Sequence, residues 1–259
     1  MRIRASGAIV ALTLLHAGAA CAQSSDDYTL LGAGVRSRPA YDGSASQRTD
    51  VIPEVRYYGR PWFARTTQGM LEGGARMEIA PGLAFGIQLA YEAGRHRSES
   101  PFLREHDIPD VNVGASLGFH LEWDGKLGRA PVNVLLRQRS NAEAIRGDQV
   151  DLRGTIGVYG SGAASVGVFG QTTWASQKST NTLYGITPDE SATSGLPAFQ
   201  AKGGVMFASL GLLGGYDFGP RWTAVWTLEE RRLEGDARRS PLAERTSNHY
   251  VSVGLAYRF

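Results

Sequence analysis

Histidines and acidic residues are the main candidates for acid–base chemistry in this chain of 259 residues. His120 and Glu122 lie two residues apart, so both side chains fall on one face of a predicted strand. Serines are numerous, and none is singled out as a nucleophile. We therefore predict no catalytic residue and no enzymatic activity, and we interpret His120 as part of a polar network inside the fold.

A metal site or a bound cofactor finds no support in the sequence. His96, Glu99, His106 and Asp107 lie close together along the chain, but their spacing matches no metal-ligand motif. The single cysteine, Cys21, excludes a multi-cysteine zinc site and a disulfide framework. Because no glycine-rich phosphate loop is present either, we predict no cofactor.

Arginines and carboxylates recur at alternating positions, which would line one face of a sheet. This set contains eight arginines, seven acids and no lysine: Glu54, Arg56, Arg65, Glu72, Arg76, Glu78, Glu92, Glu122, Arg137, Arg139, Asp151, Arg153, Glu229, Arg231 and Arg258. Arginine suits close pairing with carboxylates in a confined space. Two interpretations stay open: a salt-bridged interior that stabilises the fold, and a charged constriction that passes small solutes.

The elements that position these residues are strands, because the apolar residues alternate with small or polar ones at period two. The clearest example is Val251, Val253, Leu255, Tyr257 and Phe259 at the end of the chain. Twelve strands are predicted: 28–36, 51–58, 62–68, 70–79, 83–92, 111–123, 131–139, 149–159, 165–177, 203–217, 221–233 and 249–259. Helical periodicity is nearly absent.

The connections alternate between short and long, as periplasmic turns and external loops do in outer-membrane barrels. The longest predicted short turn is 124–130, and a tight link near Gly69 breaks the pattern on the external side. A soluble β-sandwich is the alternative. Strands longer than the usual five or six residues, with aromatic residues at their ends, argue against it. We predict an all-β, closed antiparallel transmembrane β-barrel of about 12 strands.

The composition is consistent with an exported barrel. The formal charge of +2 is too small for a strongly basic nucleic-acid-binding protein, and we predict no nucleic-acid partner. Residues 1–22 have the pattern of a secretory signal peptide, with Ala20-Cys21-Ala22 before the cleavage point. A lipidated Cys21 is the alternative. The predicted barrel domain is 23–259. The full chain has 33 glycines, which suit tight curvature.

Several short motifs, in order and with consistent spacing, carry a family resemblance. They are Tyr41-Asp42-Gly43-Ser44, Tyr184-Gly185-Ile186-Thr187-Pro188, Ser194-Gly195-Leu196-Pro197, Gly235-Asp236-Ala237 with Ser240-Pro241, and the closing Tyr257-Arg258-Phe259. With these motifs the chain resembles the MltA-interacting protein / OmpV family of Gram-negative outer-membrane proteins. Arg238 and Arg239 depart from the family's pattern, which more often has alanine after Gly-Asp-Ala.

The resemblance implies a non-enzymatic scaffold at the cell outer membrane, in contact with outer-membrane lipid. Its implied partners are a periplasmic murein transglycosylase and a peptidoglycan synthase. A narrow, porin-like channel for small charged solutes is the alternative function. The family motifs fall mainly on predicted external loops, which could instead fold inward to gate a pore. The sequence does not indicate the oligomeric state.

Overall fold

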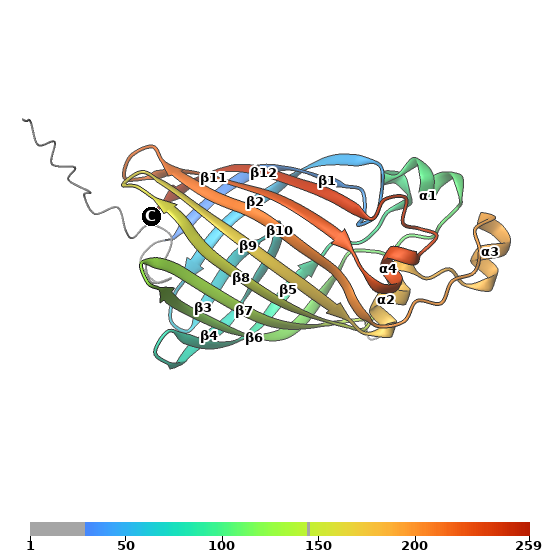
Figure 1. Ribbon diagram of the computed structural model, residues 1–259, viewed down its shortest axis with the longest axis horizontal. Helices are drawn as coiled ribbons and strands as arrows, with labels where there is room; N and C mark the ends of the chain where they lie inside the picture. The colour runs from blue at the N-terminus through green and yellow to red at the C-terminus, as the bar shows by residue number, and fades with distance from the viewer. Residues whose placement is uncertain (1–28, 144–145) are drawn as a thin grey trace, which may run out of the picture.

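The computed structural model describes residues 29–143 and 146–259, which form one closed barrel (Figure 1). Its strands are β1 (Leu30–Pro39), β2 (Gln47–Tyr58), β3 (Trp62–Thr67), β4 (Met70–Ala80), β5 (Leu83–Glu92), β6 (Gly114–Leu127), β7 (Ala130–Asn141), β8 (Asp148–Gly160), β9 (Ala164–Ala175), β10 (Gly204–Asp217), β11 (Trp222–Leu233) and β12 (Ser247–Arg258). Each strand pairs antiparallel with its sequence neighbours, and β1 pairs with β12 to close the barrel. The predicted fold class is confirmed.

Two strand boundaries differ from the prediction in an informative way. The predicted turn 124–130 is wrong, because β6 continues to Leu127 and β7 begins at Ala130. Only Gly128 and Arg129 remain outside the strands, and Gly128 has a positive φ of 60° that suits a tight turn. At its other end β6 begins at Gly114 instead of 111, because Val111 forms an isolated bridge with Arg95. The predicted signal peptide, 1–22, lies outside the described residues.

The tight link near Gly69 is confirmed as a two-residue hairpin between β3 and β4. Gln68 and Gly69 both have positive φ values, 52° and 76°, as a type I′ turn requires. Because β3 has only six residues, this hairpin ends well short of the external loops. Its tip instead contacts side chains of the lumen, as described below.

The outer half of β2 has a paired strand on one side only. β2 pairs with β1 from Gln47 to Arg56, but with β3 only through its last three residues. Pairing with β3 ends near Pro53, which has no N–H for a ladder bond and whose carbonyl accepts from the Thr66 hydroxyl. Val51 is 79% exposed, whereas Val35 and Val253, in the same register row but flanked on both sides, are 48% and 52% exposed.

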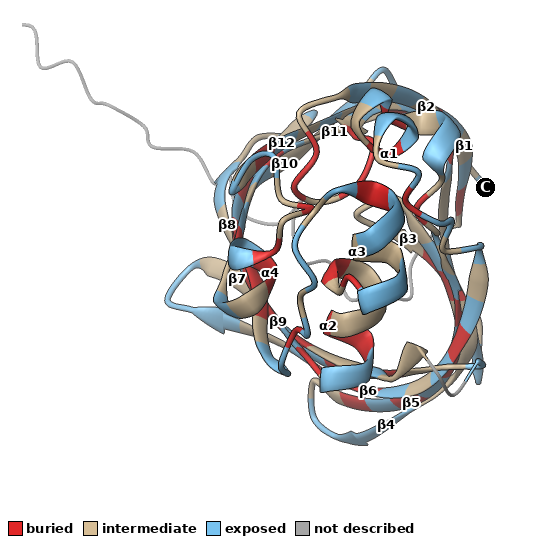
Figure 2. Ribbon diagram, turned by 90° about the vertical axis from the view of Figure 1, so that its right-hand side faces the viewer, coloured by how far each residue is buried: buried red, intermediate tan, exposed pale blue. Residues whose placement is uncertain are grey.

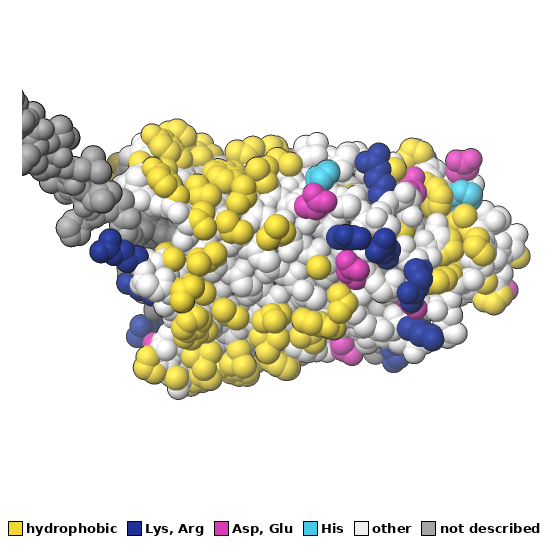
Figure 3. Space-filling model, in the orientation of Figure 1, with side chains coloured by type: hydrophobic (Ala, Val, Ile, Leu, Met, Phe, Trp, Pro, Cys, Tyr) yellow, Lys and Arg dark blue, Asp and Glu magenta, His cyan; other side chains and the backbone are white. Residues whose placement is uncertain are grey.

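Apolar side chains cover the outer surface around the half of the barrel that carries the short turns (Figure 3). Charged side chains gather toward the opposite, external end. The aromatic residues predicted at strand ends lie on this outer surface: Tyr57, Trp62, Tyr91, Trp123, Trp174, Tyr216, Trp222 and Phe259 are all exposed. No helix of the part of the chain described here is long and apolar enough to cross a membrane.

Short helices occupy the external loops, where the sequence predicted almost none. They are η1 (Arg97–Glu99), α1 (Pro101–Glu105), α2 (Gln177–Tyr184), α3 (Pro188–Ser194) and α4 (Gly235–Arg239). Viewed from the external end, these helices and their loops lie across the mouth of the barrel (Figure 2). Each is too short for a clear helical period, so the sequence pattern could not reveal it.

Candidate functional site: a charged lumen beneath a loop cap

A belt of ion pairs crosses the middle of the lumen, and Arg137 is its centre. Its guanidinium lies 2.8 Å from Glu72 on β4 and 2.8 Å from Asp151 on β8. Arg65 on β3 lies 2.6 Å from the second oxygen of Glu72 and 2.7 Å from Glu122 on β6. These side chains come from five strands, β3, β4, β6, β7 and β8, so together they bridge the interior of the barrel.

The belt continues on both sides of this centre. Arg139 lies 3.2 Å from Asp151 and 2.5 Å from Glu92 at the external end of β5. Arg76 lies 3.4 Å from Glu122. Thr173 donates its hydroxyl to Asp151 at 2.7 Å. Since Arg137, Glu72 and Asp151 are at most 2% exposed, the carboxylates obtain their hydrogen bonds from the belt.

His120 and Ser116 lie inside the lumen in settings that do not resemble a catalytic site. His120 is fully buried, contacts Gln88 at 2.6 Å through Nδ1 and packs edge-on against Phe63. Gly114-Ala115-Ser116-Leu117-Gly118 has the letters of a hydrolase nucleophile motif, but Ser116 lies within β6 and donates to Glu92 at 2.6 Å. The motif requires a sharp strand-to-helix turn, which is absent there.

Arg231 belongs to a second cluster, nearer the external end, and lines the same external cavity as Arg137 and Arg139. It lies 3.0 Å from Glu229 on the same strand and 2.9 Å from Asp42 in the first external loop. Its guanidinium also stacks on Phe207 and Tyr250. Gln68, at the tip of the β3–β4 hairpin, donates to Glu229 at 2.8 Å. The hairpin tip is thereby held against the inner wall.

Among the predicted lumen residues, Arg153 and Arg56 stand apart from both clusters. Arg153 is 8% exposed, stacks 3.8 Å over the ring of Phe169, and forms no ion pair within residues 29–143 and 146–259. Arg56 lies near the periplasmic end, with its guanidinium 5.7 Å from the ring of Tyr58. In the same ranges, no group of three or more His, Cys, Asp or Glu side chains is arranged to hold a metal ion.

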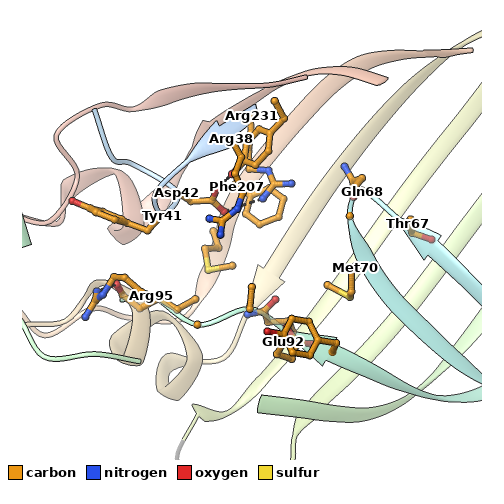
Figure 4. A pocket seen from close by; sticks show the side chains of 18 of the residues that line it. Arg38, Tyr41, Asp42, Thr67, Gln68, Met70, Glu92, Arg95, Phe207 and Arg231 are labelled. Carbon is orange, nitrogen blue, oxygen red and sulfur yellow. Dashed lines mark hydrogen bonds and ion pairs between the residues drawn. The ribbon is translucent and has the colours of Figure 1, made fainter. Parts of the chain in front are cut away.

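Cavities remain on both sides of the belt. The external cavity has a volume of about 230 Å³, and in Figure 4 Gln68 and Met70 at the hairpin tip face Arg231 and Phe207 across it. On the periplasmic side lie cavities of about 370 and 220 Å³, which share several lining residues, Arg56 and Asn133 among them. Belt side chains line the cavities on both sides, Arg137 and Arg139 the external one and Arg65 and Glu122 the 370 Å³ one, and the hairpin residues Thr67 and Gln68 line both.

The family-motif residues of the first external loop fix that loop to the last strand. The Asn248 side chain accepts from the Gly43 N–H at 2.7 Å and donates to the Ser44 carbonyl at 2.8 Å. Tyr41 donates its hydroxyl to the carbonyl of Leu242 at 2.9 Å. Gly43 has φ of +100° and leaves 3.0 Å between a hypothetical Cβ and Leu233, so both its conformation and its position favour glycine.

The motif residues of the other external loops join those loops into the same cap. Ser240 donates to the carbonyl of Tyr184 at 2.6 Å, and Asp236 accepts from the Lys202 N–H at 2.7 Å. Gly195 ends α3 in a left-handed conformation, and His106 contacts the Ser194 carbonyl at 2.8 Å. Two apolar clusters lie beneath these bonds: Ala40, Tyr41, Leu103, Ile108, Ile186 and Leu242; and Ala175, Tyr184, Met206, Phe207, Leu233 and Ala237.

Burial sets the electrostatics of the cap. It raises the pKa of Tyr41 well above its usual value, and the neighbouring Glu244 carboxylate raises that pKa further. Burial likewise raises the pKa of Tyr184. Arg95, which donates to the Leu183 carbonyl at the end of α2, has its pKa lowered by burial. Neutral phenols and a desolvated guanidinium therefore hold the cap from within.

Sequence reasoning did not identify several residues on which the lumen depends. Arg36 donates to the Gln68 carbonyl at 2.9 Å, and Arg38 lies 2.5 Å from Asp50 on β2. Gln88 donates to Glu72 at 3.1 Å. Alternation along β1 and β5 could have revealed these inward positions, because their neighbours in sequence face outward. Contacts between side chains on distant strands cannot be predicted from a single sequence.

These features define a class: a twelve-stranded β-barrel of the outer-membrane type, with its lumen crossed by ion pairs and its external mouth capped. The chain belongs to the MltA-interacting protein MipA family, whose sequence model matches residues 31–259. The family assignment predicted from the motifs is confirmed, and the chain is an outer-membrane barrel.

Three solved structures have chain traces similar to this one. The NanC porin is 10% identical, with a TM-score of 0.48 over 89% of this chain and 100% of that one. An outer membrane channel from Pseudomonas putida F1 is 10% identical, with a TM-score of 0.46 over 90% and 96%. LpxR from Salmonella typhimurium is 9% identical, with a TM-score of 0.46 over 89% and 100%. No curated protein matches the sequence.

Proposed function

We propose that this barrel is a non-enzymatic scaffold, which binds a murein transglycosylase at its periplasmic end and brings it together with a peptidoglycan synthase. The family match over residues 31–259 carries the proposal, because the family is described by its interaction with MltA. In this proposal residues 1–22 direct export and are then removed, and the barrel wall contacts outer-membrane lipid.

The occluded lumen supports a binding role over conduction. The belt around Arg137 crosses the interior, and the external mouth lies under the cap. Packing inside the barrel therefore favours a closed state. A scaffold needs no open passage, whereas its rim must be accessible from the periplasm.

The β6–β7 hairpin is the part of the periplasmic rim that best suits a docking surface. Lys126, Leu127 and Arg129 are exposed at its tip, and Leu127 is 71% exposed. Two cations beside an apolar side chain would complement an acidic surface with an apolar centre. Arg60 and Arg221, exposed in two other turns, carry the same charge. The cap motifs lie at the opposite end and cannot contact a periplasmic partner.

Co-purification with a murein transglycosylase tests the docking surface. We expect the wild-type barrel to retain the enzyme, and the double variant Lys126→Glu/Arg129→Glu to lose most of it. The matched control is Arg238→Glu/Arg239→Glu, which makes the same charge change on two exposed arginines of the cap. Equal retention by both double variants would exclude the hairpin as the docking surface, and no retention by the wild type would contradict the scaffold proposal.

A narrow channel is the second candidate, and the cavities on both sides of the belt favour it. Only side chains separate them, so a rearrangement of the belt would join them. Planar-bilayer recording tests this function: a channel would give discrete current steps that depend on salt. A silent barrel over a wide range of voltages and salt concentrations would contradict it.

A further inference from the structure

The periplasmic-side cavity of about 370 Å³ is lined by one cation and one anion that have neither a hydrogen bond nor an ion pair to any residue of 29–143 or 146–259. The cation is Arg153 on β8, and the anion is Glu54 on β2. These strands are six places apart in a ring of twelve, so the two side chains extend from opposite walls of the barrel. The volume lies within the usual range of small-molecule sites.

Arg153 is nine-tenths buried and forms no ion pair within the described residues, and the carboxylate of Glu229 acts on it only through space. It is 8% exposed, and its Nη1 has no hydrogen-bond partner. The ring of Phe169 covers one face of the guanidinium at 3.8 Å, which holds the group flat against the wall. Every arginine of the central belt has a carboxylate within 3.4 Å, and Arg153, which lies outside the belt, has none.

Glu54 is likewise unpaired, and the wall is shaped to receive its side chain. No hydrogen bond or ion pair joins it to any residue of 29–143 or 146–259. The side chain lies over Gly34 on β1 and Gly254 on β12, where a Cβ would approach Glu54 to 2.9 and 2.6 Å. Two glycines thus leave the space that the carboxylate occupies.

Other charges around the cavity are already engaged. Arg65 and Glu122 lie 2.7 Å from each other, and Asp124 accepts from Asn133 at 2.9 Å. A simple anion attracted by Arg153 would also meet the field of Glu54, and a simple cation would meet that of Arg153. A molecule with one carboxylate and one ammonium group would pair with both Arg153 and Glu54 without adding net charge to the cavity.

We propose that this cavity binds a small zwitterion, an amino acid or a short peptide, with its carboxylate on Arg153 and its ammonium group on Glu54. The ligand enters from the periplasm, because the neighbouring 220 Å³ cavity shares Arg56 and Asn133 with this one and extends to the turn residue Ala163. This binding is independent of the proposed scaffold role.

Isothermal titration calorimetry of the full barrel in detergent micelles tests the proposal, with glycylglycine as the probe. We expect binding by the wild type and a loss of at least about tenfold in affinity in each of Arg153→Gln and Glu54→Gln, since each removes one charged contact. Acetate and ethylammonium, which carry one charge each, are expected to bind at least about tenfold more weakly than glycylglycine.

Two exposed positions on the outer wall provide matched controls: Arg232→Gln and Glu230→Gln make the same changes away from the cavity and should keep wild-type affinity. Arg153→Lys, which keeps the charge, should retain more binding than Arg153→Gln if both fold. Absence of binding to the wild type, equal binding of acetate, or unchanged affinity in Glu54→Gln would overturn the proposal. Retention of the transglycosylase reports on the scaffold role separately.

Discussion

Replacing Arg137 with glutamine should destabilise the barrel more than any single change at an exposed ion pair. Arg137 makes three charge-assisted contacts: Nε to Asp151 at 2.9 Å, Nη1 to Glu72 at 2.8 Å and Nη2 to Asp151 at 2.8 Å. Removing one partner from a buried ion pair costs about 3–5 kcal/mol of unfolding free energy. Because Glu72 keeps Arg65 and Asp151 keeps Arg139, we expect a loss near the lower limit, about 3 kcal/mol.

Urea unfolding in detergent micelles, followed by tryptophan fluorescence, would measure this loss. The control is Arg232→Gln, whose partner Glu234 lies 3.6 Å away at the exposed outer end of β11, and there we expect a change within about 0.5 kcal/mol. A double-mutant cycle with Asp151→Asn should give a coupling energy of about 1–3 kcal/mol. If Arg137→Gln unfolds at the same urea concentration as Arg232→Gln, the belt does not stabilise the barrel and the argument fails.

Three further outcomes follow from the cap and from the open edge of β2. The pKa of Tyr41 is raised in the folded state, so its contribution to the free energy of unfolding is complete below the unfolded pKa of about 10 and is lost as the pH rises beyond it. Phenolate absorbance should therefore show one late-titrating tyrosine fewer in Tyr41→Phe than in the wild type, where Tyr184 also titrates late. Asn248→Ala should speed amide hydrogen exchange at Gly43, which loses its 2.7 Å bond, without changing exchange in the central strands. Val51→Cys should react faster with a membrane-soluble maleimide than Val35→Cys, because no strand covers one side of it; equal rates would mean that the edge is covered.

The strands were predictable because a barrel wall separates two solvents. Alternation such as Leu83, Phe85, Ile87 and Leu89 repeats over a whole strand, so a few exceptions do not change the prediction. The hairpin of β6 and β7 shows that alternation does not locate the end of a strand. Asp124 and Lys126 are polar enough to resemble a turn, but they continue the lumen-facing row toward the periplasm, where polar side chains meet water.

The sequence predicted which residue types line the lumen, but not which of those residues form ion pairs with one another. Period two places Arg137 and Asp151 on the inner face, but their contact depends on the register between β7 and β8, which one sequence does not define. Arg153 illustrates the limit. It has the same inward position as its neighbours, and only the positions of the surrounding carboxylates distinguish a paired arginine from an unpaired one.

The motif residues of the external loops define this family's fold, and the residues that could define its function lie elsewhere. Tyr41, Gly43 and Ser240 make hydrogen bonds within the cap, so their chemistry is accounted for by holding external loops together. A periplasmic partner must therefore recognise residues outside these motifs, on the periplasmic rim. There, two-residue turns such as Gly128-Arg129 require only that the backbone reverse tightly, and they constrain it little otherwise. It follows that members of the family can share the cap and the barrel while differing in their partner. Exchanging the exposed residues of the β6–β7 hairpin between two members should then transfer partner preference without affecting the barrel, and unchanged preference after the exchange would contradict this reasoning.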